Sequence, residues 1–221
     1  MADLMILYRN ILFSCVTLMA LLSAGKFCPA APEPAIVQPL GNWTLDVLFE
    51  QPRQIVLKSD RQAPLKRFWY TIITVTNNQD IAVDFYPQFE LVTDTFQAIS
   101  AGDGVPISVF EHVKKRHQGR YPFLEYWEKT SNKVLKGSDN TKDIAIIWPD
   151  FDTNAKGVQL FISGLSDETV AIEHPVEKDN AGRAARVMLR KTLELSYTLS
   201  GDPAFRSDTS LAYADRRWVM R

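Results

Sequence analysis

The stretch from residue 67 to residue 94 constrains the fold most, because it predicts two long strands joined by a turn. The stretch is RFWYTIITVTNNQDIAVDFYPQFELVTD. In its second half apolar and polar residues alternate, which is typical of a strand with one buried and one exposed face. In its first half, bulky residues from Phe68 to Val75 occupy both odd- and even-numbered positions and so point to both faces of a strand. This pattern indicates a strand covered on both sides. Asn77, Asn78 and Asp80 suit a turn, so the stretch predicts a β-hairpin.

The N-terminal segment, residues 1–30, predicts a signal peptide. Arg9 precedes an apolar run over residues 11–24, and that run is shorter than the roughly 20 residues of a membrane-spanning helix. Cys28 at −3 and Ala30 at −1 resemble the small-x-small cleavage rule. We therefore expect a periplasmic or secreted protein. An uncleaved signal segment, which would be its contact with a membrane, is the alternative.

Removal of this segment leaves a mature chain without cysteine, because both cysteines of the sequence lie within it. Neither a disulfide framework nor thiol catalysis is then expected. The segment also carries Arg9, Lys26 and Asp3, so 25 basic and 26 acidic residues become 23 and 25, a net charge near −2. This balance gives no general reason to expect nucleic acid as a partner.

The remaining sequence predicts a Pro-rich tether at residues 31–41 and a β-domain at residues 42–221. Alternating residues indicate strands near Trp43–Phe49 and over Val187–Leu199, and the final run SLAYADRRWVMR can pair back as a last strand. From Pro106, the segment ISVFEHVKKRHQ has the spacing of one short amphipathic helix.

Strands without intervening helices predict a mainly β protein, an antiparallel immunoglobulin-like sandwich with one short helical insertion. The helix and the irregular loop after it make that insertion, at about residues 105–140. An antiparallel barrel is the rival architecture. The paired cysteines of antibody domains are absent, so the likeness is one of architecture.

Several segments of the predicted domain resemble a known family. They are WYTIITVTNNQDIAVDFYPQFELVTDT, LKGSDN, VQLFISGLSDET, LRKTLELSYTLSGD and RRWVMR. They look like an uncharacterised family of exported bacterial proteins of the planctomycete type. The VTNN segment is also similar to immunoglobulin-like domains of bacterial surface proteins and lipoproteins. The resemblance implies export and a β-sandwich, and it implies no catalytic residue.

The three histidines do not predict a metal site. His112 and His117 are five residues apart, which puts them roughly 140° apart on a helix, and no HExxH motif accompanies them. We interpret these two and His174 as exposed surface residues.

One spacing suggests a calcium-binding loop, but two residues that such a loop requires are absent. Asp150, Asp152 and Asn154 have the i, i+2, i+4 spacing of calcium ligands, but Ala155 replaces the required glycine and Phe161 the glutamate. An Asx-rich turn is the simpler interpretation. The sequence has no GxSxG motif, no P-loop and no dinucleotide fingerprint. We therefore predict no catalytic residue, no cofactor and no metal.

One segment is a candidate for partner binding, because a basic run at residues 114–116 is followed by four aromatic residues between positions 121 and 127. A basic run is most often the exposed face of a helix, and loop aromatics often pack beneath their own loop. Loops on rigid β-domains also carry recognition. Core packing and a binding patch are both left open. The candidate contact residues are Lys115, Arg116, Arg120, Phe123, Tyr126 and Trp127.

These observations predict an exported, non-catalytic binding or assembly module of the cell envelope, whose partner is another envelope protein or polymer. The alternative is a hydrolase or carbohydrate-active accessory domain whose site forms only in three dimensions. A pocket with two convergent carboxylates would favour the enzyme. An aromatic patch and an open sheet edge would favour binding.

Overall fold

The computed structural model describes residues 31–36, 41–58, 64–201 and 209–221, so the predicted signal peptide lies outside the described residues. The described part is mainly β and has one α-helix. Its elements are β1 (Asp46–Phe49), β2 (Arg53–Lys58), β3 (Leu65–Thr76), β4 (Val83–Asp84), β5 (Gln88–Thr93), β6 (Ala98–Ser100), α2 (Ile107–His117), β7 (Glu125–Tyr126), β8 (Lys133–Val134), β9 (Lys142–Pro149), β10 (Gly157–Ser163), β11 (Thr169–Lys178), β12 (Ala184–Ser200) and β13 (Ser210–Met220), with short 3-10 turns at Trp127–Lys129 and Ser138–Asn140.

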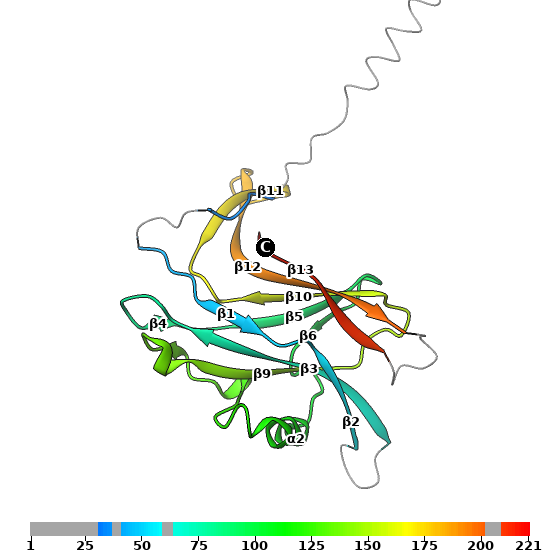
Figure 1. Ribbon diagram of the computed structural model, residues 1–221. Helices are drawn as coiled ribbons and strands as arrows, with labels where there is room; N and C mark the ends of the chain where they lie inside the picture. The colour runs from blue at the N-terminus through cyan, green and yellow to red at the C-terminus, as the bar shows by residue number, and fades with distance from the viewer. Residues whose placement is uncertain (1–30, 37–40, 59–63, 202–208) are drawn as a thin grey trace, which may run out of the picture. The chain divides into compact units, whose positions relative to one another are not determined.

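The first sheet is built around β3 (Figure 1). On one side β3 pairs with β1 and then with β2, with Val47 opposite Val75 and Ile55 opposite Phe68. On its other side β3 pairs antiparallel with β9, and the short β7 runs parallel to β9. Between β1 and β2 the edge strand is interrupted at Pro52, which cannot donate to the ladder.

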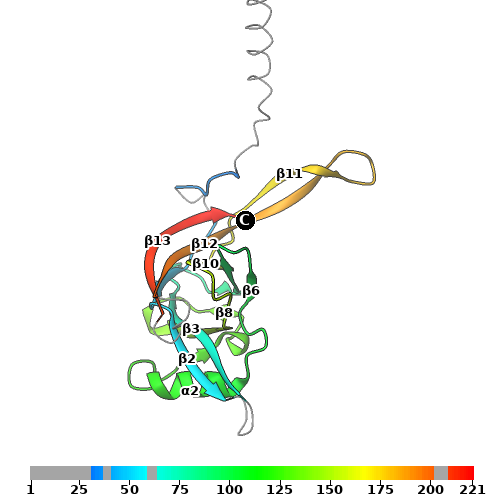
Figure 2. The ribbon, with the colours of Figure 1, turned by 90° about the vertical axis from the view of Figure 1, so that its right-hand side faces the viewer.

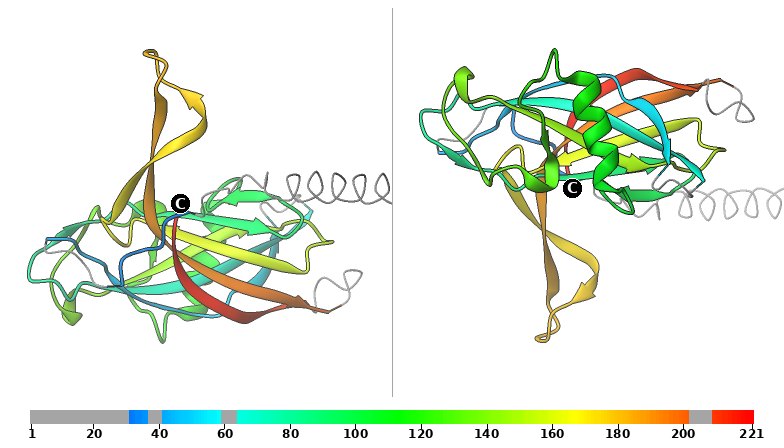
Figure 3. Two further views of the ribbon diagram at one scale, coloured as in Figure 1. Left: turned by 90° about the horizontal axis from the view of Figure 1, so that it is seen from above. Right: turned by 90° about the horizontal axis from the view of Figure 1, so that it is seen from below.

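The second sheet has β12 as its longest strand. β10 and β13 flank β12, and β10 is followed outward by β5 and β6, all antiparallel. The pairing confirms that the C-terminal run folds back as a last strand. The N-terminal part of β12 pairs with β11 instead, and these two strands form a projecting hairpin over residues 169–190, which we call the arm (Figures 2 and 3).

The two sheets bury one continuous apolar core between them. Trp69, Ile73 and Val75 of β3 enter it from the first sheet, and Leu160 and Leu193 enter it from the second. The coarse prediction of a mainly β protein with antiparallel sheets and one helix is therefore confirmed for the described residues.

The other face of the first sheet is covered by α2 (Figure 3, right). Phe68, Tyr70 and Ile72 of β3 belong to a second buried cluster with Val109 and Val113 of the helix. β3 thus has buried side chains on both faces, which confirms the interpretation of its bulky residues on both parities.

The predicted β-hairpin over residues 67–94 is wrong, because β3 lies in the first sheet and β5 in the second. The chain crosses between the sheets where the turn was expected. The buried Asn77 amide donates to the carbonyl oxygens of Ile81 and Val134, at 2.8 and 3.0 Å, and β4 pairs with β8. Alternation reports which face of a strand is buried, but it does not report which strand lies beside it.

Candidate functional site

A groove lies on the outer face of the first sheet, beyond the C-terminal end of α2, and we call it the Glu50 groove. Its volume is about 630 Å³. The bend between β1 and β2 forms one side of the groove, and the loop after α2 forms another. Its lining residues are Leu48, Phe49, Glu50, Gln51, Arg53, Ile72, Thr74, Arg120, Tyr121, Thr141 and Asp143.

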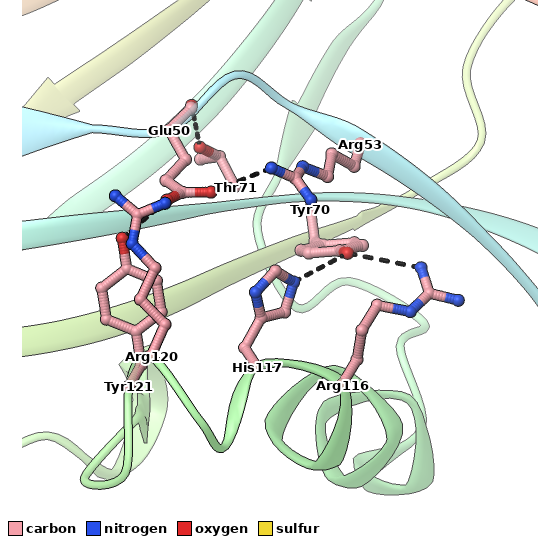
Figure 4. Close-up of polar contacts among 8 residues, drawn as sticks. All are labelled: Glu50, Arg53, Tyr70, Thr71, Arg116, His117, Arg120 and Tyr121. Carbon is pink, nitrogen blue, oxygen red and sulfur yellow. Dashed lines mark hydrogen bonds and ion pairs between the residues drawn. The ribbon is translucent and has the colours of Figure 1, made fainter.

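The carboxylate of Glu50 is held by three donors (Figure 4). The Tyr121 hydroxyl donates to Oε1 at 2.7 Å, Arg120 is paired with the same oxygen at 2.6 Å, and Arg53 with Oε2 at 3.3 Å. The backbone of Glu50 is also fixed, because Thr71 Oγ1 donates to its carbonyl oxygen at 2.6 Å. The Glu50 side chain is 13% exposed, so a largely buried charge is matched by charge-assisted bonds.

The two arginines that pair with Glu50 remain open to solvent. The side chain of Arg53 is 54% exposed and that of Arg120 is 72% exposed. A guanidinium has five N–H donors, so each arginine can hold Glu50 and still donate to a ligand. Glu50 thereby orients two cations at the mouth of the groove.

Tyr121 stays protonated in this arrangement. Burial, followed by the hydrogen bond to Glu50, raises the pKa of Tyr121 to about 12. The Arg120 guanidinium lies 5.2 Å from the centre of the Tyr121 ring. The phenol is therefore a fixed donor that positions Glu50 and Arg120.

His117 lies at the end of α2 and contacts β3. Its Nε2 is 3.0 Å from the Tyr70 hydroxyl, and Arg116 donates to that hydroxyl at 3.4 Å. Burial, and then the positive charge of Arg53, lowers the pKa of His117. The ring is therefore neutral at pH 7. The prediction that this histidine is exposed is wrong, because its side chain packs against Tyr70 beneath the helix.

The predicted contact residues are divided between the surface and the core. Lys115, Arg116 and Arg120 are exposed, and Phe123 is 84% exposed. Tyr126 is 4% exposed, and its ring lies 5.2 Å from that of Phe110.

Trp127 is half-buried and packs against both apolar clusters. Its ring lies 5.7 Å from that of Phe89. Core packing thus describes Tyr126 and Trp127, whereas Phe123 and the three cations form an exposed surface.

The groove brings together residues that sequence reasoning did not select. Glu50 and Arg53 flank the bend at Pro52, and Asp143 comes from β9, where Thr74 donates to its carboxylate at 2.6 Å. Two carboxylates therefore line one groove. The break in alternation at Pro52 was the one signal in the sequence that could have drawn attention to Glu50.

The groove has the chemistry of an anion-binding site more than that of a metal site. Among the described residues, no group of three or more His, Cys, Asp or Glu side chains could hold a metal ion. Arginine guanidiniums match carboxylate and phosphate groups through paired N–H donors. In a concave site, a few placed polar or charged groups fix the orientation of the ligand and give specificity.

Comparisons with protein-family models, curated proteins and solved structures found no match. In the part of the chain that the structure describes, no helix has the length and apolar character needed to cross a membrane.

Proposed function

We propose that the protein is an exported, non-catalytic binding or assembly module of the cell envelope, and that the Glu50 groove holds an anionic group of its partner. The observation that carries the proposal is the pair of exposed guanidiniums of Arg53 and Arg120, both oriented by Glu50. The partner is another envelope protein or a polymer that carries carboxylate or phosphate groups.

The charge around the groove supports an anionic partner. Lys115 and Arg116 are exposed on the last turn of α2, next to Arg120 in the loop. Basic side chains at a helix C-terminus are also favourable for the helix itself. Arg120 and Arg53 lie outside the helix, and they bring two more guanidiniums to the groove, which Glu50 and Asp143 also line.

Export to the periplasm or the exterior is supported by the sequence of residues 1–30. An immunoglobulin-like sandwich is supported by the shared core of two antiparallel sheets and by the crossing of the chain between them after β3. Such domains present loops from a rigid framework, and the loop that carries Arg120 and Phe123 fits that use.

The proposal is tested by titrating the full chain with two polymers, polyphosphate and polygalacturonate, and measuring affinity by calorimetry. The Arg53→Gln/Arg120→Gln variant should bind at least about tenfold more weakly. Arg183→Gln is the matched control, because Arg183 is an exposed arginine paired with Asp179 outside the groove. Absence of binding to both polymers, or an equal loss in the control, would contradict the proposal.

A hydrolase is the second candidate, and the presence of Glu50 and Asp143 in one groove favours it. Against it, both oxygens of Glu50 are engaged by Arg53, Arg120 and Tyr121. A catalytic pair predicts that Glu50→Gln and Asp143→Asn abolish the hydrolysis of a polymer that the wild type degrades. The binding proposal predicts no degradation of polygalacturonate by the wild type.

A further inference from the structure

The arm leaves one backbone edge of β12 open. β12 pairs with β13 over residues 191–200 and with β11 over residues 184–190. β13 is followed by Arg221, which accepts from the Arg190 N–H at 2.8 Å and donates to the Arg190 carbonyl oxygen at 3.1 Å. Among the described residues, no strand pairs with β12 on the β13 side over residues 184–188 (Figures 2 and 3). We call this segment the arm edge.

The hydrogen bonds of Arg190 show which backbone groups of the arm edge are open. Successive residues of a strand direct their N–H and C=O groups to opposite sides. Because Arg190 bonds to Arg221, the groups of Met188, Arg186 and Ala184 point to that same side, away from β11. An extended chain can pair with such a row of donors and acceptors as an added strand.

Other edges of the second sheet are less suited to an added strand. β6 is only three residues long. β11 contains Pro175, which has no N–H to donate. The edge of β13 is engaged by the bend after β1, where Gln51 donates to the Leu211 carbonyl oxygen. The arm edge contains no proline.

One face of the arm edge is basic. Arg186 and Arg190 are exposed on it. Glu173 lies opposite Arg186 on β11, and Glu90 pairs with Arg221 beside Arg190, so three guanidiniums and two carboxylates leave one positive charge in excess. Neighbouring strands lie about 4.8 Å apart. A strand added at the arm edge would therefore lie next to Arg186 and one strand further from Glu173.

The opposite face of the arm edge is apolar. Val187 and Leu189 lie there opposite Ile172 and Val170 of β11, and all four side chains are half-buried. Alternate side chains of an added strand would extend this apolar row. The two faces of the arm edge thus ask for different side chains at alternate positions of a partner strand.

From this edge we infer that the arm takes up an extended peptide of a partner protein as an added strand. Acidic side chains of the peptide lie beside Arg186, and apolar ones lie beside Val187. A second copy of this chain fits less well, because pairing of two arm edges brings their arginines together. Polyphosphate has no N–H groups to pair with the carbonyl oxygens of β12, so this site differs from the Glu50 groove in its ligand.

The inference is tested by titrating the full chain with the peptide TVEVEVT, blocked at both ends, and following amide resonances and hydrogen exchange by NMR. The peptide should bind with a Kd of about 1 mM or lower. The amides of Ala184, Arg186 and Met188 should exchange more slowly in the complex. Those of Val187 and Leu189 point to β11 and should change little.

Two control peptides separate charge from strand pairing. TVKVKVT reverses the charge, and TVEPEVT keeps the acidic residues but lacks one N–H. Both should bind at least about tenfold more weakly than TVEVEVT. Arg186→Glu should reverse the preference between TVEVEVT and TVKVKVT. Met188→Pro removes an outward N–H and leaves the pairing with β11 intact, so it should weaken the binding of TVEVEVT at least about tenfold.

Lys133→Glu is the matched control, because it changes the net charge equally on β8, in a different sheet. It should leave the affinity for TVEVEVT unchanged. The Arg53→Gln/Arg120→Gln variant should also retain it, so failure of this inference is separate from failure of the anionic site. Absence of TVEVEVT binding, equal binding of TVKVKVT, or slowed exchange at β6 in place of the arm edge would overturn the inference. Unchanged affinity in both Arg186→Glu and Met188→Pro would overturn it as well.

Discussion

The outer faces of the two sheets are constructed in opposite ways. On the first sheet, Phe68, Tyr70 and Ile72 are buried beneath α2. On the second sheet, no described helix covers the outer face, which carries polar and charged side chains instead. There Glu194 accepts from Arg217 at 2.9 and 3.0 Å, and Gln159 donates to it at 3.0 Å.

This difference teaches where binding surfaces arise in the molecule. The side chains of the covered face are buried beneath α2, and the Glu50 groove lies beyond the C-terminal end of that helix. The uncovered face carries paired charges, and a second groove, of about 630 Å³ and lined by Glu90, Phe161 and Arg190 among others, lies where that face meets the arm.

The largest expected effect comes from placing a charge on each face. Ile72→Asp should unfold the protein or lower its free energy of unfolding by about 4–5 kcal/mol, because it places a carboxylate in the buried apolar cluster beneath α2. Val92→Asp is the matched change on the uncovered face of β5, where Val92 is half-buried. It should cost about 1 kcal/mol or less. Chemical denaturation measures both, and equal losses would break the comparison.

A smaller effect is expected in the segment after α2, where Phe123 is exposed and Tyr126 of β7 is buried. Tyr126→Ala should cost about 3–5 kcal/mol, because it removes a buried ring from the cluster beneath the helix. Phe123→Ala should change stability by about 0.5 kcal/mol or less, since Phe123 is exposed. Thermal melts measure both variants. Equal shifts in the melting temperature would contradict the burial of Tyr126.

The smallest expected effect is the response of the covered face to acid. The pKa of His117 is lowered in the folded state. As the pH falls below about 6.5, His117 is therefore protonated in the unfolded chain before it is protonated in the folded chain. The stability contributed by neutral His117 is present above that pH and is lost as the pH falls towards the folded pKa. Denaturation of wild type and His117→Gln between pH 7.5 and about 5 should show a smaller pH dependence in the variant. An identical dependence would contradict the buried, neutral imidazole.

The sequence predicted the structure correctly where the burial of a segment's own side chains determines the spacing of its apolar residues. The bulky residues of β3 on both parities predicted two buried faces, and the alternation over Val187–Leu199 predicted the half-exposed strand that is now β12. α2 begins where the sequence indicated, although Pro106 is its N-cap residue and does not lie in the first turn, as had been predicted. These features depend on the local spacing of apolar residues, which is visible in one chain segment.

Strand partners and the site were not predictable in the same way. β3 and β5 follow one another in the chain, yet Asn77 fixes a crossing between the sheets. The Glu50 groove joins residues 50, 53, 121 and 143 through the registers of β1, β3 and β9. Such long-range pairing leaves no periodic signal. Of the six candidate contact residues predicted from the sequence, only Arg120 lines the groove.

The most direct test of the anionic site is an NMR titration of the full chain with polyphosphate, observed at the arginine Nε–H groups. The account predicts that the resonances of Arg53, Arg116 and Arg120 shift, and that the shifts shrink as salt is added. The arm arginines Arg183 and Arg186 should remain unchanged. Shifts of similar size at all arginines, or shifts confined to the arm, would contradict the assignment of anion binding to the Glu50 groove.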